Sequence, residues 1–345
     1  MTRRIGSRPF PGILPRATRL LISGVPLALL GACNADKTLT TPLAATPPDS
    51  VAPIDPTKFP PLVGQIAFVS TRDGSPYIFV AAADGSSLRR LTKGISPEWS
   101  SDAKQIVFNG ADSAGDASIH IINADGTGEH VLAVSGGGPS LSPDGRRIAF
   151  SAALGLYVAN SDGSNPTLLV RRDFEAPEGC GVWGAAWSPD GTRIAFVSAC
   201  TNWVDWDQPP AVYVANVDGS GIIGTVQPGS FPRWSPDGSM IAFGTQAFDY
   251  FPGNGPHNPG LPKSAVAFAK PDGSNLRLID TGTLVADEAD WSPDGRGLLL
   301  IANTKSGLRS FVTDTSFRTT KLLLPDAQTG RVYEDYDAVW SRVAR

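Results

Sequence analysis

The feature that most constrains this fold is a repeated segment in which a tight turn leads into an apolar strand. Its copies open with "WSSDA", "LSPDG", three times "WSPDG", and a final "WS", at Trp99, Leu141, Trp187, Trp234, Trp291 and Trp340. The spacings between them are 42, 46, 47, 57 and 49 residues. A period of this size is typical of propeller blades, which are four-stranded sheets that cannot bury both faces alone. The copies are therefore expected to stack side by side.

Each copy follows the same order of turns and strands. In Ser-Pro-Asp-Gly the proline fixes φ, the aspartate accepts local hydrogen bonds, and the glycine adopts a φ that other residues resist. Strands such as "RIAFVS", "VYVANVDGS" and "RRLT" follow. A second tight turn begins at Asp84, Asp125, Asp162, Asp218 and Asp272. We expect each repeat to form four antiparallel strands with two short turns.

The strand "IAFVS" has the pattern of a strand that is packed on both faces. Ile194 and Phe196 point to one face, and Ala195 and Val197 point to the other. The tryptophans have two interpretations: wedges between neighbouring blades, or an aromatic box for a ligand. One tryptophan at the same place in each blade favours the wedge.

The two ends of the repeat region complete each other. Residues 65 to 92 supply three strands without a preceding tryptophan strand, and Asp337 to Ser341 is a tryptophan strand with nothing after it. The prediction is an all-β, six-bladed β-propeller of four-stranded antiparallel blades. The C-terminal strand would join the N-terminal blade and remove the open sheet edges.

The N-terminal residues read as an export signal. Residues 1–32 carry five arginines and no acidic residue, and the apolar run Leu20 to Leu30 is too short to span a bilayer. The following "LGAC" resembles the bacterial lipobox, in which the cysteine, here Cys33, is lipidated. The alternative is an ordinary secretory signal with Cys33 incidental. Both interpretations place the mature protein outside the cytoplasm.

Residues 33–62 read as a lipidated cysteine followed by a proline-rich tether, and residues 63–345 as the propeller. Seven prolines occur between residues 34 and 62. At about 3.1 Å per residue in polyproline geometry, this tether would reach up to roughly 90 Å.

The repeat resembles the TolB-type propeller repeat, in which tryptophan-Ser-Pro-Asp-Gly precedes "IAF", an aliphatic strand ending in Asp-Gly, and "RLT". The match covers residues 65 to 341. The resemblance implies a six-bladed propeller of the kind found in periplasmic Tol-Pal components and other envelope proteins, where it generally serves as a protein-binding platform. TolB carries a small α/β domain ahead of its propeller and is soluble in the periplasm. This chain has a tether and a lipobox there, so it is interpreted as a TolB-like lipoprotein.

Length variation points to one face of the propeller. In a four-stranded blade, the first-to-second and third-to-fourth turns emerge on one face and the other connections on the opposite face. Three insertions, 172–184, 201–210 and 246–264, belong to the second group, and loops commonly carry function. Exposed aromatic residues beside carboxylates are typical of recognition patches. The candidate partner-binding residues are Phe174, Trp203, Asp205, Trp206, Asp207, Phe248, Asp249, Tyr250, Phe251 and His257.

Two further interpretations of these insertions stay open. The aromatic rings could fold back to fill their own loops, or they could form a sugar-binding surface. Cys180 and Cys200 lie ten residues before and after Asp190, so in an unbulged hairpin they would nearly face each other. They form a candidate disulfide, with free buried thiols as the alternative.

Several function classes are disfavoured. Without residues 1–32 the chain has 29 − 5 = 24 basic and 33 acidic residues, a charge of −9 that argues against nucleic-acid binding. The three histidines are too scattered for a metal cluster, and no Gly-x-Ser-x-Gly elbow occurs. Asp205, Asp207 and Asp249 lack the spacing of a calcium loop.

We therefore expect no catalytic residue, metal or cofactor. We expect a monomeric, non-enzymatic envelope protein, anchored to the membrane through its N-terminal lipid, that binds a protein or peptidoglycan-associated partner. The alternatives are a carbohydrate-binding module, or a polysaccharide hydrolase or lyase with acidic residues around the central channel.

Overall fold

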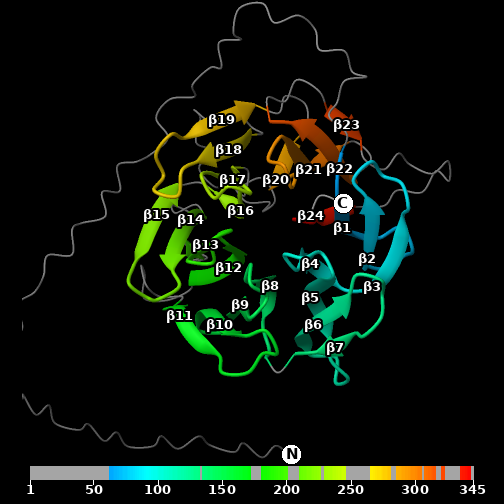
Figure 1. The fold of residues 1–345 in the computed structure, drawn as a ribbon, viewed down its shortest axis with the longest axis horizontal. Helices are drawn as coiled ribbons and strands as arrows, with labels where there is room; N and C mark the ends of the chain where they lie inside the picture. Colours follow the sequence, from blue (N-terminus) through cyan, green and yellow to red (C-terminus); the bar gives the residue numbers. More distant parts are fainter. Residues whose placement is uncertain are drawn as a thin grey trace, which may run out of the picture. The chain divides into compact units, whose positions relative to one another are not determined.

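The computed structural model confirms the predicted six-bladed, all-β propeller. It describes residues 62–132, 134–171, 180–200, 210–226, 229–245, 265–280, 285–304, 307–315, 320–322 and 335–342. Within these residues, six four-stranded antiparallel sheets are arranged around an axis (Figure 1). None of the described residues forms a helix that is long and apolar enough to cross a membrane. The signal segment, Cys33 and the tether up to Pro61 lie outside the described residues.

The blades are numbered here in chain order, with the strand nearest the axis first. Blade 1 contains β24 (Asp335–Trp340), β1 (Gln65–Ser70), β2 (Tyr77–Ala82) and β3 (Arg89–Lys93). Blade 2 contains β4 (Ile95–Trp99), β5 (Gln105–Ala111), β6 (Ala117–Asn123) and β7 (His130–Val131). Blade 3 contains β8 (Gly137–Leu141), β9 (Arg147–Ala152), β10 (Gly155–Asn160) and β11 (Thr167–Arg171).

The remaining three blades repeat this order. Blade 4 contains β12 (Cys180–Trp187), β13 (Arg193–Cys200), β14 (Ala211–Asn216) and β15 (Ile222–Val226). Blade 5 contains β16 (Ser230–Trp234), β17 (Ile241–Gly244), β18 (Ala265–Ala269) and β19 (Arg277–Asp280). Blade 6 contains β20 (Val285–Trp291), β21 (Gly297–Thr304), β22 (Gly307–Asp314) and β23 (Thr320–Leu322). The first strand of each blade lines the axis (Figure 1).

The ring closes as predicted, by pairing the C-terminal strand β24 with β1. At the closure, the hydrogen bonds of the repeated turn are formed although no turn connects the two strands. In blade 4, Ser188 N–H donates to the Arg193 carbonyl, and Arg193 N–H donates to Ser188 Oγ. At the closure, Ser341 N–H donates to the Gln65 carbonyl at 2.8 Å, and Gln65 N–H donates to Ser341 Oγ at 2.9 Å. The chain ends are therefore joined by the same local pattern that joins neighbouring strands elsewhere.

The Ser-Pro-Asp-Gly turns are held by a side-chain network that repeats from blade to blade. In blade 5, Ser235 Oγ donates to Asp237 Oδ1 at 2.6 Å, and Ser239 N–H donates to the same oxygen at 3.0 Å. Met240 N–H donates to Ser235 Oγ at 3.0 Å. Gly238 has a φ of 70°, which glycine adopts without steric cost. The turn residues thus satisfy one another rather than a ligand.

The tryptophans lie between blades, which confirms the wedge interpretation. Trp187 Nε1–H donates to the Ser140 carbonyl of the preceding blade at 3.0 Å. Trp234 makes the same bond to the Ala186 carbonyl at 3.0 Å. The guanidinium of Arg147 lies 4.7 Å from the centre of the Trp187 ring. Trp187 and Trp234 are therefore each held through packing, a hydrogen bond and a cation–π contact, whereas Trp99 Nε1 is buried without a hydrogen-bond partner among the described residues.

The inner strands carry a bulge that the sequence pattern did not predict. The strand register shifts in each blade a few residues before the tryptophan position. Ser96, Phe231 and Asp337, each three residues before a tryptophan, have φ values of 51°, 50° and 49°. Such values are uncommon for residues other than glycine. The bulge changes which side chains point along the axis, as bulges beside functional sites do.

We predict that Ser235→Ala lowers the free energy of unfolding by about 1 kcal/mol at neutral pH, because the hydroxyl that bonds Asp237 and Met240 is lost. Hydrogen bonds from Ser235 and Ser239 lower the pKa of Asp237 below its ordinary value of 3.8. A carboxylate with a lowered folded-state pKa stabilises the protein above pH 3.8, and this contribution is lost as the pH falls through the folded-state pKa. The deficit of the variant should therefore shrink in acid.

Urea unfolding of both proteins between pH 7 and pH 2 measures this deficit. Ser113→Ala, in the exposed turn between β5 and β6, is the control and should show no pH-dependent deficit. A Ser235→Ala deficit that is constant across this pH range would contradict the assignment.

Candidate functional site

The candidate partner-binding residues that the sequence predicts all lie outside the described residues. They are Phe174, Trp203, Asp205, Trp206, Asp207, Phe248, Asp249, Tyr250, Phe251 and His257. The strands beside them are described: β11 and β12, β13 and β14, and β17 and β18. Because strand direction alternates within each blade, the ends of these strands that adjoin the insertions share one face, opposite the Ser-Pro-Asp-Gly turns. The recognition patch itself stays a prediction.

The backbones of Cys180 and Cys200 are paired directly in the β12–β13 ladder. The tight turn alone would offset them by one residue, because Trp187 pairs with Ile194. The register shift between Trp183 and Ala186 removes that offset. The pairing places the two residues opposite each other, and disulfide formation stays a prediction.

The axis carries a group of charged residues that the sequence analysis did not single out. They are found at the position just before the first residue of each copy. The six residues at this position, three of them charged, are Glu98, Ser140, Ala186, Arg233, Asp290 and Val339. Glu98 on β4 and Arg233 on β16 form an ion pair. Blades 2 and 5 are opposite each other in the ring, so this pair crosses the axis (Figure 1). The exposed fractions of the two side chains are only 18% and 16%.

Burial and opposite charges compete at this pair. Burial raises the pKa of Glu98 above its ordinary value of 4.5, and the Arg233 guanidinium partly offsets that effect. Burial would lower the pKa of Arg233, but the carboxylates of Glu98, Asp290 and Glu288 outweigh it and raise that pKa. Arg233 is therefore a fixed cation close to three carboxylates, those of Glu98, Asp290 and Glu288.

Asp290 ties blade 6 to the closing strand. Its buried carboxylate accepts hydrogen bonds from the backbone N–H of Trp340 at 2.7 Å and of Trp291 at 2.9 Å. Arg342, which follows β24, donates from Nη2 to Asp290 Oδ1 at 3.0 Å. Arg342 Nη1 is buried without a hydrogen-bond partner among the described residues. Nη1 is thus a buried donor without an acceptor among these residues, while the Arg342 side chain as a whole is 34% exposed.

A pocket of about 210 Å³ surrounds these groups at the face that carries the Ser-Pro-Asp-Gly turns. Its wall is made by turn residues and by repeat tryptophans. Its charged residues are Glu98, Arg233 and Arg342. The residues that form it are Ser101, Pro143, Pro189, Pro236, Trp99, Leu141, Trp187, Trp234, Ser140, Ala186, Glu98, Arg233 and Arg342. This arrangement can hold an apolar side chain and pair a carboxylate with Arg342.

The sequence contains a pattern that indicates charged residues near the axis. The residue before the repeat tryptophan is charged in three copies, Glu98, Arg233 and Asp290, although the tryptophan that follows it is buried. Charged residues are seldom buried without a partner. Among the described residues, no group of three or more His, Cys, Asp or Glu side chains is placed to hold a metal ion.

Comparison with known proteins identifies the fold. The chain matches no protein-family model and no curated protein sequence. The structure of TolB from Acinetobacter baumannii is similar, with a TM-score of 0.62 and 19% identity over 81% of this chain and 66% of that chain. This chain thus spans just under two thirds of that TolB structure.

Two further structures share the fold. A chain in a nidogen/laminin complex has a TM-score of 0.59 and 12% identity, over 80% of this chain and 97% of that one. A protein of Agrobacterium tumefaciens that carries the TolB name has a TM-score of 0.54 and 16% identity, over 82% and 99%. At these identities the likeness shows the propeller fold alone.

We predict that the axial ion pair is strongly coupled. Glu98→Met and Arg233→Met should each lower the free energy of unfolding by about 3 kcal/mol, because each leaves the partner charge buried without its counterion. The double variant should lose far less than the sum, with a coupling energy above about 1 kcal/mol. Urea unfolding of the four proteins measures this coupling.

The exposed pair Arg90 and Asp73, 3.0 Å apart, is the matched control. Its coupling should stay below about 1 kcal/mol, since exposed ion pairs contribute little. Additive losses at Glu98 and Arg233 would show that the two side chains do not interact across the axis.

Proposed function

We propose that this chain is an exported, lipid-anchored propeller that binds a protein or cell-wall-associated partner and catalyses no reaction. Its fold is the six-bladed propeller that TolB and a chain of the nidogen/laminin complex also have. The nidogen/laminin structure is a complex of two proteins, so a propeller of this kind can take part in protein binding. The envelope location and the anchor rest on the lipobox-like segment ending at Cys33.

The observation that carries the proposal is the axial pocket. Its walls of proline and tryptophan belong to turns and strands that are held by hydrogen bonds, so it exists before a partner arrives. Arg342 lines this pocket with a partly exposed guanidinium that is anchored to Asp290. An apolar wall beside an arginine suits the centre of a protein interface, where arginine is enriched and other charged residues are depleted. A partner segment with an apolar side chain and a carboxylate would satisfy both features.

The absence of catalysis is proposed because the axial charges are engaged with one another. Glu98 pairs with Arg233, and Asp290 accepts three hydrogen bonds. A general acid or base must exchange a proton with a substrate, and a carboxylate held in this way is poorly suited to that exchange.

The insertion-bearing face is a second proposed contact region. It rests on the sequence, through Trp203, Trp206 and Tyr250, and on the common face of the strands from which the insertions leave. The two regions lie on opposite faces, so a cross-linker on each face distinguishes them.

We predict that a photoreactive amino acid at Ser101, in the axial pocket, captures the partner in intact cells. Arg342→Gln should reduce this capture by at least about tenfold, because a charge-assisted hydrogen bond is lost. Arg296→Gln, which changes an exposed arginine outside the pocket, should leave capture unchanged. A thermal unfolding measurement confirms that each variant is folded.

Three outcomes contradict part of this proposal. Capture from Tyr250 but not from Ser101 would move the binding site to the insertion-bearing face. Capture of a glycan, lost in Trp203→Ala and Trp206→Ala, would favour the carbohydrate-binding module. Turnover of an envelope polysaccharide by the purified chain would overturn the non-enzymatic assignment.

The anchor is tested separately. Cys33→Ser should move the protein from the membrane fraction to the soluble fraction, because the thiol that would carry the lipid is removed. Cys180→Ser is the matched control and should stay with the membrane. Equal membrane association of wild type and Cys33→Ser would exclude lipidation at this residue.

A further inference from the structure

The interface between blades 2 and 3 lacks two side chains that the next two interfaces have. Where blades 4 and 5 have Trp187 and Trp234, blade 3 has Leu141. The arginines that stack on those indoles are Arg147 and Arg193, with guanidinium-to-ring distances of 4.7 and 4.9 Å.

Gln105 occupies the matching position in blade 2, five residues after the turn serine Ser100, as Arg147 is five after Ser142. Leucine is smaller than tryptophan, and glutamine is shorter than arginine and uncharged. The interface between blades 2 and 3 therefore lacks both the ring and the cation that are present between blades 3 and 4 and between blades 4 and 5.

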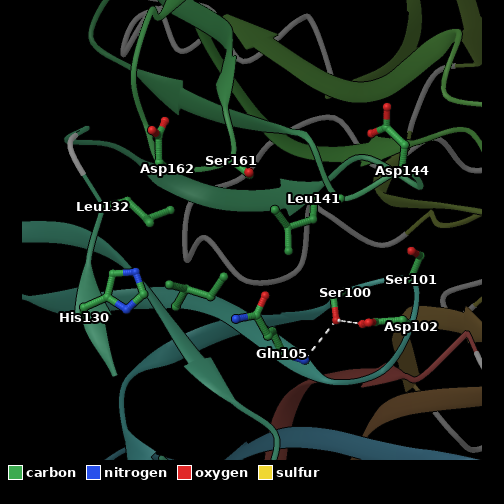
Figure 2. A pocket seen from close by; sticks show the side chains of 12 residues that line it. Ser100, Ser101, Asp102, Gln105, His130, Leu132, Leu141, Asp144, Ser161 and Asp162 are labelled. Atoms are coloured by element: carbon green, nitrogen blue, oxygen red, sulfur yellow. Dashed lines mark hydrogen bonds between the residues drawn. The ribbon is translucent and has the colours of Figure 1, made fainter. Parts of the chain in front are cut away.

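A pocket of about 480 Å³ lies at this interface (Figure 2). Leu132 of blade 2 and Leu141 of blade 3 reach into it from the two blades, and Gln105 reaches in from below in the view shown. With Ile121, these leucines form a buried apolar floor. The volume is within the range of about 300 to 1,000 Å³ that is usual for ligand pockets. We call this pocket the interblade slot.

The rim of the interblade slot is acidic. Asp102, Asp144 and Asp162 line it, and no lysine or arginine does. Each carboxylate is fixed by its own turn: Ser100 Oγ donates to Asp102 at 2.8 Å, Ser142 Oγ to Asp144 at 2.5 Å, and Ser164 N–H to Asp162 at 2.8 Å.

The hydrogen bond from the serine in each turn is the largest cause that lowers the pKa of these three aspartates. All three are therefore ionised at neutral pH. Lys104 pairs with Asp102 at 3.2 Å, and the positive charges of Arg146 and Arg147 help to lower the pKa of Asp144. No cation contributes to the lowered pKa of Asp162, so its negative charge is the least offset of the three.

We propose that the interblade slot binds an aromatic side chain flanked by basic residues, presented by a segment of a partner protein. The interfaces between blades 3 and 4 and between blades 4 and 5 show what this geometry accepts, namely an indole between two blades with a guanidinium stacked on it. The segment supplies both groups, and the acidic rim attracts its cations. This site goes beyond the proposed function, because the axial pocket selects a carboxylate and the interblade slot selects a cation. The two pockets adjoin and share Ser101 and Leu141.

The test is calorimetric titration of the purified full chain with three short peptides. N-acetyl-Arg-Trp-Arg-amide is expected to bind, and N-acetyl-Glu-Trp-Glu-amide and N-acetyl-Arg-Ala-Arg-amide are each expected to bind at least about tenfold more weakly. The first comparison tests the charge of the rim, and the second tests the apolar floor. Equal binding of all three peptides, or no binding of the first at millimolar concentration, would overturn the proposal.

Leu141→Trp supplies the decisive variant, because it restores the side chain that the repeat has in the other blades. It is expected to abolish peptide binding while thermal unfolding shows an equal or higher midpoint. Unchanged binding would place the peptide elsewhere.

Asp162→Asn keeps the acceptor of its turn and removes one rim charge, and it is expected to weaken binding several-fold even if Leu141→Trp fails to fold. Asp218→Asn is the matched control, since Asp218 accepts the Ser220 N–H at 2.9 Å in the equivalent turn of blade 4. Equal weakening by both variants would contradict the assignment. Arg342→Gln should leave peptide binding unchanged, so that failure of this site is distinguishable from failure of the axial pocket.

Discussion

The ring depends on the indole that each blade places against the blade before it. Trp187, Trp234 and Trp291 donate their Nε1–H to the carbonyl of the residue just before the repeat position of the preceding blade, at 3.0, 3.0 and 3.2 Å. The same rings are packed against apolar side chains of that blade. The contact therefore joins each of these blades to the one before it, as neighbouring repeats are joined in a repeat protein. Where the indole is missing, at Leu141, the two blades leave the interblade slot.

Closure of the ring brings together charges that are far apart in the sequence. Asp290 receives the backbone N–H of Trp340 from the closing strand and the guanidinium of Arg342 that follows it. Glu98 and Arg233 meet across the axis only because six blades place β4 and β16 opposite each other. Buried ion pairs contribute little net stability, but breaking one is costly. The axial network therefore favours the closed ring over a partly opened one.

The two faces of the propeller have different physical characters. At one face, short turns hold their own aspartates in fixed hydrogen bonds, and both described pockets open there. The insertions leave from the other face, which adjoins strand ends of blades 3, 4 and 5. Rigid pockets select a ligand by shape and charge, whereas long connections tolerate change in sequence and length. A scaffold of this kind can present two independent surfaces.

The sequence by itself determined the blade number, the closing strand, the face of the tight turns and the place of the tryptophans. These features follow from local chemistry: Ser-Pro-Asp-Gly turns, alternation such as Ile194 and Ala195, and a repeat period. The tertiary structure alone decided the bulges at Ser96 and Phe231, the pairing of Glu98 with Arg233, and the interblade slot. The ion pair and the interblade slot depend on distances between residues in different blades, and the bulges depend on the register between two strands of one blade. No local pattern contains either. The aromatic insertion residues were found from the sequence, and their arrangement lies outside the described residues.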